Sequence, residues 1–216
     1  MGPRPLSANG PALAVADRAK LGAAARGLLQ GLSCHEYIHA LQARKLRADA
    51  VKFIAAWLPP RDSLWFATLG VWQVYRLQPG PGHRELIDKV VAYVTEPTRA
   101  ACAGFGPLGA AAKDTSPLGL LIQAAILTGD NICPYPKKVI TPEPELAGKA
   151  AANALVAAAS RWPGKDRNAC LDSFIVLGLD LAEGKHLWAP NPDQKYPGLR
   201  VATRETMFGK PRNIWE

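Results

Sequence analysis

Apolar residues recur three and four positions apart along most of the chain, and short runs rich in proline and glycine separate these stretches. This spacing gathers apolar side chains on one face of an α-helix. It predicts helices at residues 13–30, 33–45, 47–58, 62–77, 83–94, 118–127, 145–162 and 167–183, with a shorter segment over 97–104. Apolar and polar residues do not alternate convincingly with a period of two, which is the pattern of a β-strand. We therefore predict an all-α fold, a compact orthogonal or irregular bundle of about eight short helices with an extended C-terminal tail.

Composition divides the chain into three parts. Residues 1–12 hold three prolines and two glycines, and we expect a flexible lead-in to a single helical domain over 13–188. Residues 189–216 form a proline-rich, basic and aromatic tail that ends in Ile214 and Trp215. Large apolar residues near a chain end usually dock on a surface. The sequence leaves open whether these two pack on their own domain or on a partner.

The helix predicted over 62–77 is apolar on nearly all sides, which favours a central, buried position. Trp65 and Trp72 lie seven residues apart and share a face of this helix, and Trp57 lies in the preceding helix. Beside leucine and valine at helical spacing, the three tryptophans are expected in the core. A stacking platform for nucleotides or sugars is the weaker alternative.

Arg61 is the most suggestive single residue for the arrangement of these two helices. It follows Pro59 and Pro60, which must end the preceding helix because proline has no N–H to donate. Asp62 or Ser63 is then expected to cap the next helix. We predict a structural role for Arg61, whose guanidinium would fix the angle between the two helices by binding carbonyls or a carboxylate.

His35, Glu36 and His39 match the pattern H-E-x-x-H, in which two histidines one helical turn apart bind zinc and the glutamate polarises a water. Ser33, three residues before Glu36, forms a competing pattern, the capping box of a helix N-terminus. A catalytic zinc site also needs a third protein ligand, and the following residues lack the G-x-x-H extension. The sequence favours the capped helix start and keeps the zinc site as the alternative. No metal and no other cofactor is expected.

The remaining motifs give weaker evidence for a functional site. The glycine-rich run Gly104–Gly109 lacks the strand and the Lys-Ser/Thr pair of a phosphate-binding loop, so we predict a turn between helices. His83 and His186 stand alone in the sequence, and capping or packing roles are expected for both.

The composition is that of a globular protein, with 48% hydrophobic and 20% charged residues. No stretch reaches the roughly 18 uninterrupted apolar residues that a membrane span needs. Charged residues interrupt residues 12–29, so a signal peptide is not expected. The four cysteines form no C-x-x-C pair, which favours reduced thiols in a bacterial-type cytoplasm.

The net charge of +8 is unevenly spread. Residues 1–47 hold seven Lys/Arg against two Asp/Glu, whereas residues 48–188 hold 14 against 13. A dense basic stripe, which is typical of nucleic-acid-binding proteins, is missing. The excess of positive charge in the N-terminal part is expected on solvated helix faces. Nucleic acid is not expected as a partner.

Residues 50–67, AVKFIAAWLPPRDSLWFA, resemble the core of an uncharacterised bacterial all-helical family with a domain of unknown function, A-V-x-F-L-A-x-x-L-P-x-R-E-A-V-W-W-A. The resemblance spans residues 33–188. Further matching residues are Ala92, Tyr93, Val94, Pro97, Arg99, Ala124, Ala125, Gly129, Asn131, Pro134, Phe174, Leu177, Gly178, Asp180, Ala182, Gly184 and Trp188. The resemblance implies a cytoplasmic protein without established catalysis, linked in some members to specialised secretion. The family keeps a pair like Glu36-Tyr37 but not the flanking histidines.

Taken together, these patterns favour a non-enzymatic adaptor or structural subunit that binds other proteins in a bacterial cytoplasmic assembly, with a specialised secretion system as the suggested setting. The tail over 189–216 is the expected contact segment. The candidate structural and interaction residues are Trp57, Arg61, Trp65, Trp72, Ile214 and Trp215. The alternative is a zinc-dependent hydrolase that uses the H-E-x-x-H motif.

Overall fold

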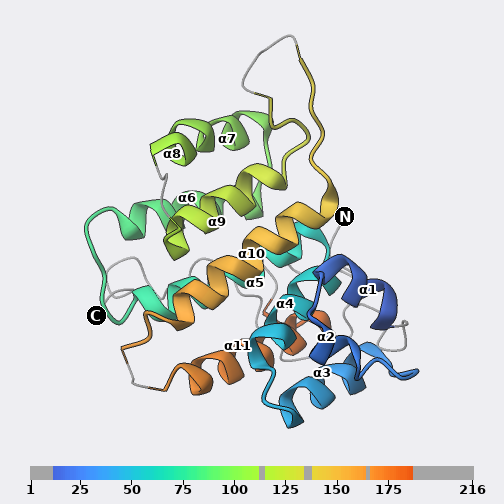
Figure 1. Cartoon of the computed structure of the whole chain (residues 1–216). Helices are drawn as coiled ribbons and strands as arrows, with labels where there is room; N and C mark the ends of the chain where they lie inside the picture. Colours follow the sequence, from blue (N-terminus) through green and yellow to red (C-terminus); the bar gives the residue numbers. More distant parts are fainter. Residues whose placement is uncertain (1–11, 112–114, 134–137, 164–165, 187–216) are drawn as a thin grey trace.

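The computed structural model describes residues 12–111, 115–133, 138–163 and 166–186. The described residues contain no β-strand, so the all-α prediction is confirmed (Figure 1). The helices are α1 (Ala12–Ala19), α2 (Ala23–Arg26), α3 (Cys34–Ala43), α4 (Arg47–Trp57), α5 (Pro60–Tyr75), α6 (His83–Thr95), α7 (Arg99–Ala103), α8 (Phe105–Ala111), α9 (Pro117–Leu127), α10 (Pro144–Ala159) and α11 (Arg167–Ala182).

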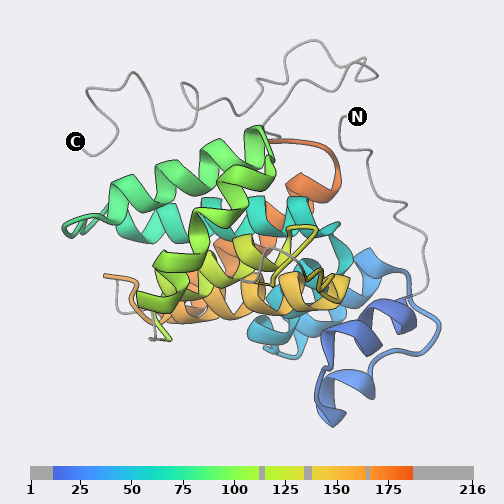
Figure 2. The ribbon, with the colours of Figure 1, turned by 90° about the horizontal axis from the view of Figure 1, so that it is seen from above.

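Helices α4, α5, α9, α10 and α11 form the centre of the molecule. α10 packs against α9, α5 and α4, and α11 packs against α4. Figure 1 shows α9 and α10 lying side by side across α5, and Figure 2 shows α6 lying along α5. Twelve of the sixteen residues of α5 are buried, which confirms the central position predicted for this helix.

Small residues allow the central helices to approach closely. α10 buries seven alanines and Gly148. A Cβ atom added to Gly148 would lie 2.9 Å from the carbonyl oxygen of Ala55 in α4. An added Cβ at Gly178 in α11 would meet side chains of α4 and α5, Ile54 at 2.5 Å and Phe66 at 3.0 Å. These contacts leave no room for a larger residue at either glycine.

The start of α5 differs from the prediction. The helix begins at Pro60 with Pro59 in the N-cap position, and neither Asp62 nor Ser63 caps it. Proline fits the first helical position because its missing N–H would have no partner within the helix there. Asp62 and Ser63 are therefore inside the first turn, where both are buried.

Two other segments also differ from the predicted elements. The helix expected over 13–30 is divided into α1 and α2, and Lys20 between them has a φ of 48°. A residue in the left-handed region cannot continue a right-handed helix. The run Gly104–Gly109, expected to be a turn, lies mostly within α8, because glycine lowers helix stability without preventing a helix that packs.

The predicted lead-in lies almost wholly outside the described residues, as does the tail with Ile214 and Trp215. Within the described part of the chain, no helix combines the length and the apolar character that a bilayer span needs.

Candidate functional site

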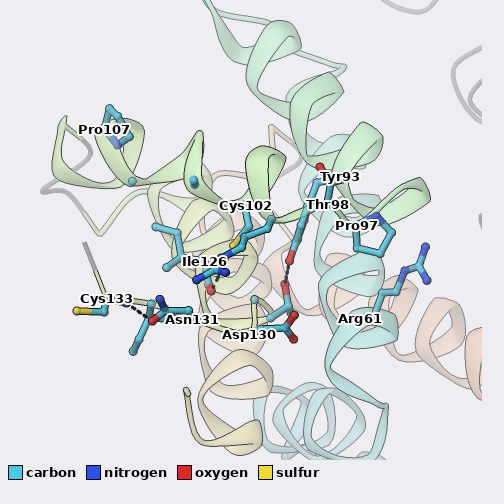
Figure 3. Close-up of a pocket in the computed structure, with 16 residues that line it drawn as sticks. Arg61, Tyr93, Pro97, Thr98, Cys102, Pro107, Ile126, Asp130, Asn131 and Cys133 are labelled. Carbon is cyan, nitrogen blue, oxygen red and sulfur yellow. Dashed lines mark hydrogen bonds between the residues drawn. The ribbon is translucent and has the colours of Figure 1, made fainter. Parts of the chain in front are cut away.

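A pocket of about 900 Å³ opens between α6, α7, α8 and the segment that follows α9 (Figure 3). Its lining combines apolar, hydroxyl, amide, thiol and charged groups. Lining residues that carry these groups are Arg61, Tyr93, Pro97, Thr98, Arg99, Cys102, Ile126, Thr128, Asp130, Asn131, Ile132 and Cys133. The volume lies in the range of about 300–1,000 Å³ that is typical of ligand-binding pockets.

Tyr93 of α6 contributes a fixed phenol to this pocket. Its ring is buried and makes an edge contact with Phe105 at a centroid distance of 5.5 Å. Its hydroxyl lies 3.4 Å from the hydroxyl oxygen of Thr128. Burial is the main reason that the pKa of Tyr93 is raised to about 12. The phenol is therefore protonated near neutral pH and can donate a hydrogen bond to a ligand.

Two of the four free cysteines line the pocket. Cys102 of α7 is buried, and its thiol lies 3.9 Å from the carbonyl oxygen of Ile126, to which it donates. Cys133 is half-buried, and in Figure 3 its sulfur points away from Cys102. The reduced state of these thiols stays a prediction.

Asn131 organises the segment between α9 and α10. Its side-chain oxygen accepts hydrogen bonds from the N–H groups of Cys133 (2.9 Å) and Ile140 (2.8 Å). Its amide nitrogen donates to the carbonyl of Lys138 at 3.0 Å. We call residues 131–133 and 138–143 the connector arm. One asparagine thus joins the two described sides of the arm and shapes a wall of the pocket.

Arg61 lies at the edge of the pocket and joins α5 to the C-terminal end of α6. Its Nε donates to the carbonyl of Val94 at 2.7 Å, and one terminal nitrogen donates to the carbonyl of Thr95 at 3.0 Å. The carbonyl contacts expected for Arg61 are present, and these two bonds join α5 to α6. The reason is that the last carbonyls of a helix have no partner within the helix.

The carboxyl group next to Arg61 is unusual. Asp62 is 8% exposed, and burial raises its pKa to about 6, an effect that the neighbouring Arg61 partly opposes. Asp62 is thus a buried residue of the first turn of α5, whereas the sequence predicted that it or Ser63 caps the helix.

The three predicted tryptophans have different surroundings. Trp65 is fully buried, and its indole N–H donates to the carbonyl of His186 at 2.7 Å. Trp57 is also buried and makes an edge contact with His35 at 5.2 Å. Trp72 is half-buried, with the guanidinium of Arg76 at 4.9 Å from its ring. The core role is confirmed for Trp57 and Trp65, and the main pocket includes none of the three among its lining residues.

The predicted capping box is present at the start of α3. Glu36 accepts hydrogen bonds from the N–H of Ser33 (2.9 Å) and from its hydroxyl (2.7 Å), and these bonds lower the pKa of Glu36. His35 lies against Trp57, whereas His39 is exposed. Within the described part of the chain, no group of three or more His, Cys, Asp or Glu side chains could hold a metal ion. The zinc hypothesis stays a prediction that these contacts do not favour.

The sequence did not identify the pocket, although several of its residues belong to the family pattern. Tyr93, Pro97, Arg99 and Asn131 were part of the resemblance, but nothing in their spacing indicated a common site. They come from α6, the turn after it, α7 and the connector arm, and only the packing of these elements brings them together. The one sequence feature that could have indicated the pocket was the presence of polar residues at the ends of predicted helices.

The described lining groups are suited to binding more than to acid–base chemistry. The phenol of Tyr93 is protonated near neutral pH, and the thiol of Cys102 faces a carbonyl rather than a base that could activate it. Arg99 and Asp130 add exposed charges of opposite sign. Hydrogen-bonding groups, apolar walls and a mixed-charge edge together can recognise a peptide backbone with its side chains.

Comparison with known proteins gives one match. No curated protein and no solved structure matches the chain. A family model described as "Family of unknown function (DUF6931)" matches residues 37–182, which is more than half of the chain. This agrees with the resemblance that residues 33–188 carry. The protein belongs to this family of unknown function, DUF6931.

Proposed function

We propose that the protein is a non-enzymatic, protein-binding adaptor, and that the pocket between α6, α7, α8 and the connector arm holds a peptide segment of its partner. The observation that carries this proposal is the pocket itself, with about 900 Å³ of space and walls from several elements. A surface pocket of this volume lies in the range of known ligand-binding pockets and can hold a few peptide residues.

The chemistry of the pocket supports a peptide over a purely apolar ligand. The hydroxyls of Tyr93 and Thr128 can bond to backbone amides. Ile126 provides an apolar wall for side chains, and the exposed charges of Arg99 and Asp130 can select the charge of the segment that leaves the pocket. Specificity would then come from few polar contacts, as in other pockets for small ligands and peptides.

The setting of the adaptor is part of the same proposal. The family resemblance suggests a bacterial cytoplasmic assembly linked to specialised secretion. The tail over 189–216 is a candidate second contact for the partner, and it lies outside the described residues.

Filling the pocket tests the proposal. Gly106 lines the pocket, and a Cβ atom added there would meet no atom within 4 Å. Gly106→Phe therefore places a ring at the pocket without disturbing the core. The matched control is Gly22→Phe, because Gly22 is exposed, has open space around an added Cβ and lies outside the pocket.

Tagged full-length proteins would be purified from the native host, and their bound proteins identified by mass spectrometry. We expect Gly106→Phe to lose a stoichiometric partner that the wild type and Gly22→Phe both retain. Retention of the same partners by Gly106→Phe would contradict a role for this pocket in partner binding.

A further inference from the structure

We propose that the chain's own tail occupies the pocket until a partner binds, and that Ile214 and Trp215 are the residues that insert. Both belong to residues 208–216, FGKPRNIWE, which lie outside the described residues. The inference rests on the proposed function for what displaces the tail, a peptide segment of the partner. The docking itself is argued from the point where the described chain ends, from the length of the tail and from the chemistry of pocket and segment.

The structure fixes the point from which the tail leaves the helical domain. Gly184, just after α11, has a φ of 83°, and the N–H of Lys185 donates to the carbonyl of Asp180 at 2.8 Å. A left-handed residue with such a backward bond turns the chain at the end of a helix. The carbonyl of His186 then accepts a hydrogen bond from the indole N–H of Trp65 at 2.7 Å. The last described residue is therefore held against α5.

This exit point lies close to the pocket. Arg61 and Trp65 are four residues apart in α5, and side chains at this spacing are neighbours on a helix. Arg61 lines the pocket, and Figure 3 shows it beside Pro97 at one side of the space. The tail therefore begins about one helical turn along α5 from the edge of the pocket.

The tail is long enough to return to this edge. Ile214 follows His186 by 28 residues, and an extended chain spans about 3.3 Å per residue. Reach therefore does not limit the contact. A segment that is linked to its own site acts at an effective concentration of about 1 mM when the linker is short. At lower protein concentrations, the tail of the same chain is favoured over the tail of a second copy.

The described lining of the pocket suits an apolar pair that contains an indole. Apolar walls come from Pro97, Pro107, Ile126 and Ile132. A buried indole N–H also needs an acceptor. The hydroxyl of Thr128 and the carboxylate of Asp130 line the same pocket and can accept from Trp215.

The charges on the two sides of the apolar pair complement the edge of the pocket. Arg212 precedes Ile214 and Trp215, and Glu216 follows them. The pocket has Asp130 and Arg99 at its edge, and both are exposed. Each charge of the segment therefore finds an unlike charge there.

Photo-cross-linking of the full-length protein tests the contact. Trp215→p-benzoylphenylalanine keeps an aromatic side chain in the tail and, under ultraviolet light, bonds covalently to a neighbouring group. At about 1 µM protein, well below the effective concentration of a linked segment, we expect a cross-link within one chain to residues 93–107 or 126–133. Gly106→Phe, which fills the pocket, should abolish this cross-link, and Gly22→Phe should leave it unchanged.

Competition with a free peptide gives a second measurement. The probe is a fluorescein-labelled peptide with the sequence of residues 206–216, TMFGKPRNIWE. The full-length double variant Ile214→Asp, Trp215→Asp should bind the probe at least about tenfold more tightly than the wild type, because its own tail no longer competes. The matched control is Leu13→Asp, Val176→Asp, which changes two exposed apolar residues outside the pocket and should bind the probe as weakly as the wild type.

Circular dichroism should show the same helix content in all variants. The proposal is overturned if the cross-link joins two chains, forms outside the pocket or persists in Gly106→Phe. It is also overturned if the double variant binds the probe no more tightly than the wild type. Neither measurement includes a partner, so a failure here would leave the peptide-binding function standing as long as Gly106→Phe loses the partner of the wild type.

Discussion

The central helices and the region around the pocket are built in different ways. α4, α5, α10 and α11 are 11 to 16 residues long, and glycine and alanine bring them into close contact. α7 and α8 have five and seven residues, and polar bonds such as the Thr98 cap of α7 and those of Asn131 define the neighbouring segments. Dense apolar contacts stabilise the first region, whereas the second region leaves a pocket that polar and charged side chains line.

Substitutions of glycine show the difference between the two regions most directly. They are also expected to have the largest effect on the free energy of unfolding. Gly148 and Gly106 are both within helices, but an added Cβ would approach a backbone oxygen at 2.9 Å in the first case and no atom in the second. Gly148→Val should lower the free energy of unfolding by about 2–3 kcal/mol through overpacking. Gly106→Val should change it by less than about 0.5 kcal/mol. Urea denaturation measures both, and equal losses would contradict the contrast between the two regions.

Asp62 sharpens the comparison because it places a titratable group within the central region. Its pKa of about 6 in the folded protein exceeds the unfolded value near 3.8. The folded state therefore binds more protons between these values, and stability should fall as the pH rises from about 4 to about 6. Asp62→Asn should flatten this dependence and raise stability at pH 7 by about 2 kcal/mol.

Thermal denaturation over pH 4–8 measures this effect. The control is Asp130→Asn at the exposed edge of the pocket, which should keep the wild-type slope between pH 4 and pH 6. A wild-type slope in Asp62→Asn would show that another group causes the pH dependence.

Arg61 links the two regions, since it joins central α5 to α6 at the edge of the pocket. Arg61→Lys replaces a fork of donors to two carbonyls by a single ammonium group. We expect a loss of about 1–2 kcal/mol in the free energy of unfolding. Arg99→Lys, which changes an exposed arginine of the same pocket, should have no measurable effect. Equal stability of both variants in urea denaturation would mean that the carbonyl contacts of Arg61 add nothing.

The smallest effect on global stability is expected in the connector arm. Asn131→Ala removes three hydrogen bonds from partly exposed backbone groups, and we expect a loss below about 1 kcal/mol. The amides of Cys133 and Ile140 should nevertheless exchange with solvent much faster. Hydrogen exchange measured by mass spectrometry detects this, with the exposed Asn153→Ala in α10 as control. Unchanged exchange over 131–140 would contradict the role of Asn131.

Local sequence signals predicted much of the fold. Ser33 with Glu36 forms the capping box that their spacing predicted. Asp166 caps α11 just before the predicted start of that helix. The predicted start of α5 was wrong because Asp62 and Ser63 are good caps in isolation, but proline two residues earlier already suits the first helical turn. The predicted turn over Gly104–Gly109 was wrong because packing of α8 against α9 compensates for poor helix propensity.

The candidate site was less predictable than the helices. Arg61 was identified from its position after two prolines, and its carbonyl contacts were expected, but the helix that supplies them was not. Tyr93 and Asn131 had no local signal of a site. The H-E-x-x-H match gave a stronger sequence signal, yet the structure shows the capping bonds of Glu36 at that position.

The sequence by itself determined the helical class, the main helix ends and the burial of α5, because these depend on side-chain spacing and on bonds within a few residues. Tertiary structure alone decided the pocket and the hydrogen bonds that hold the connector arm. Both depend on residues that lie far apart in the chain, such as Tyr93 and Thr128 or Asn131 and Ile140. Their approach depends on how closely small residues allow the helices to pack, which no local pattern encodes.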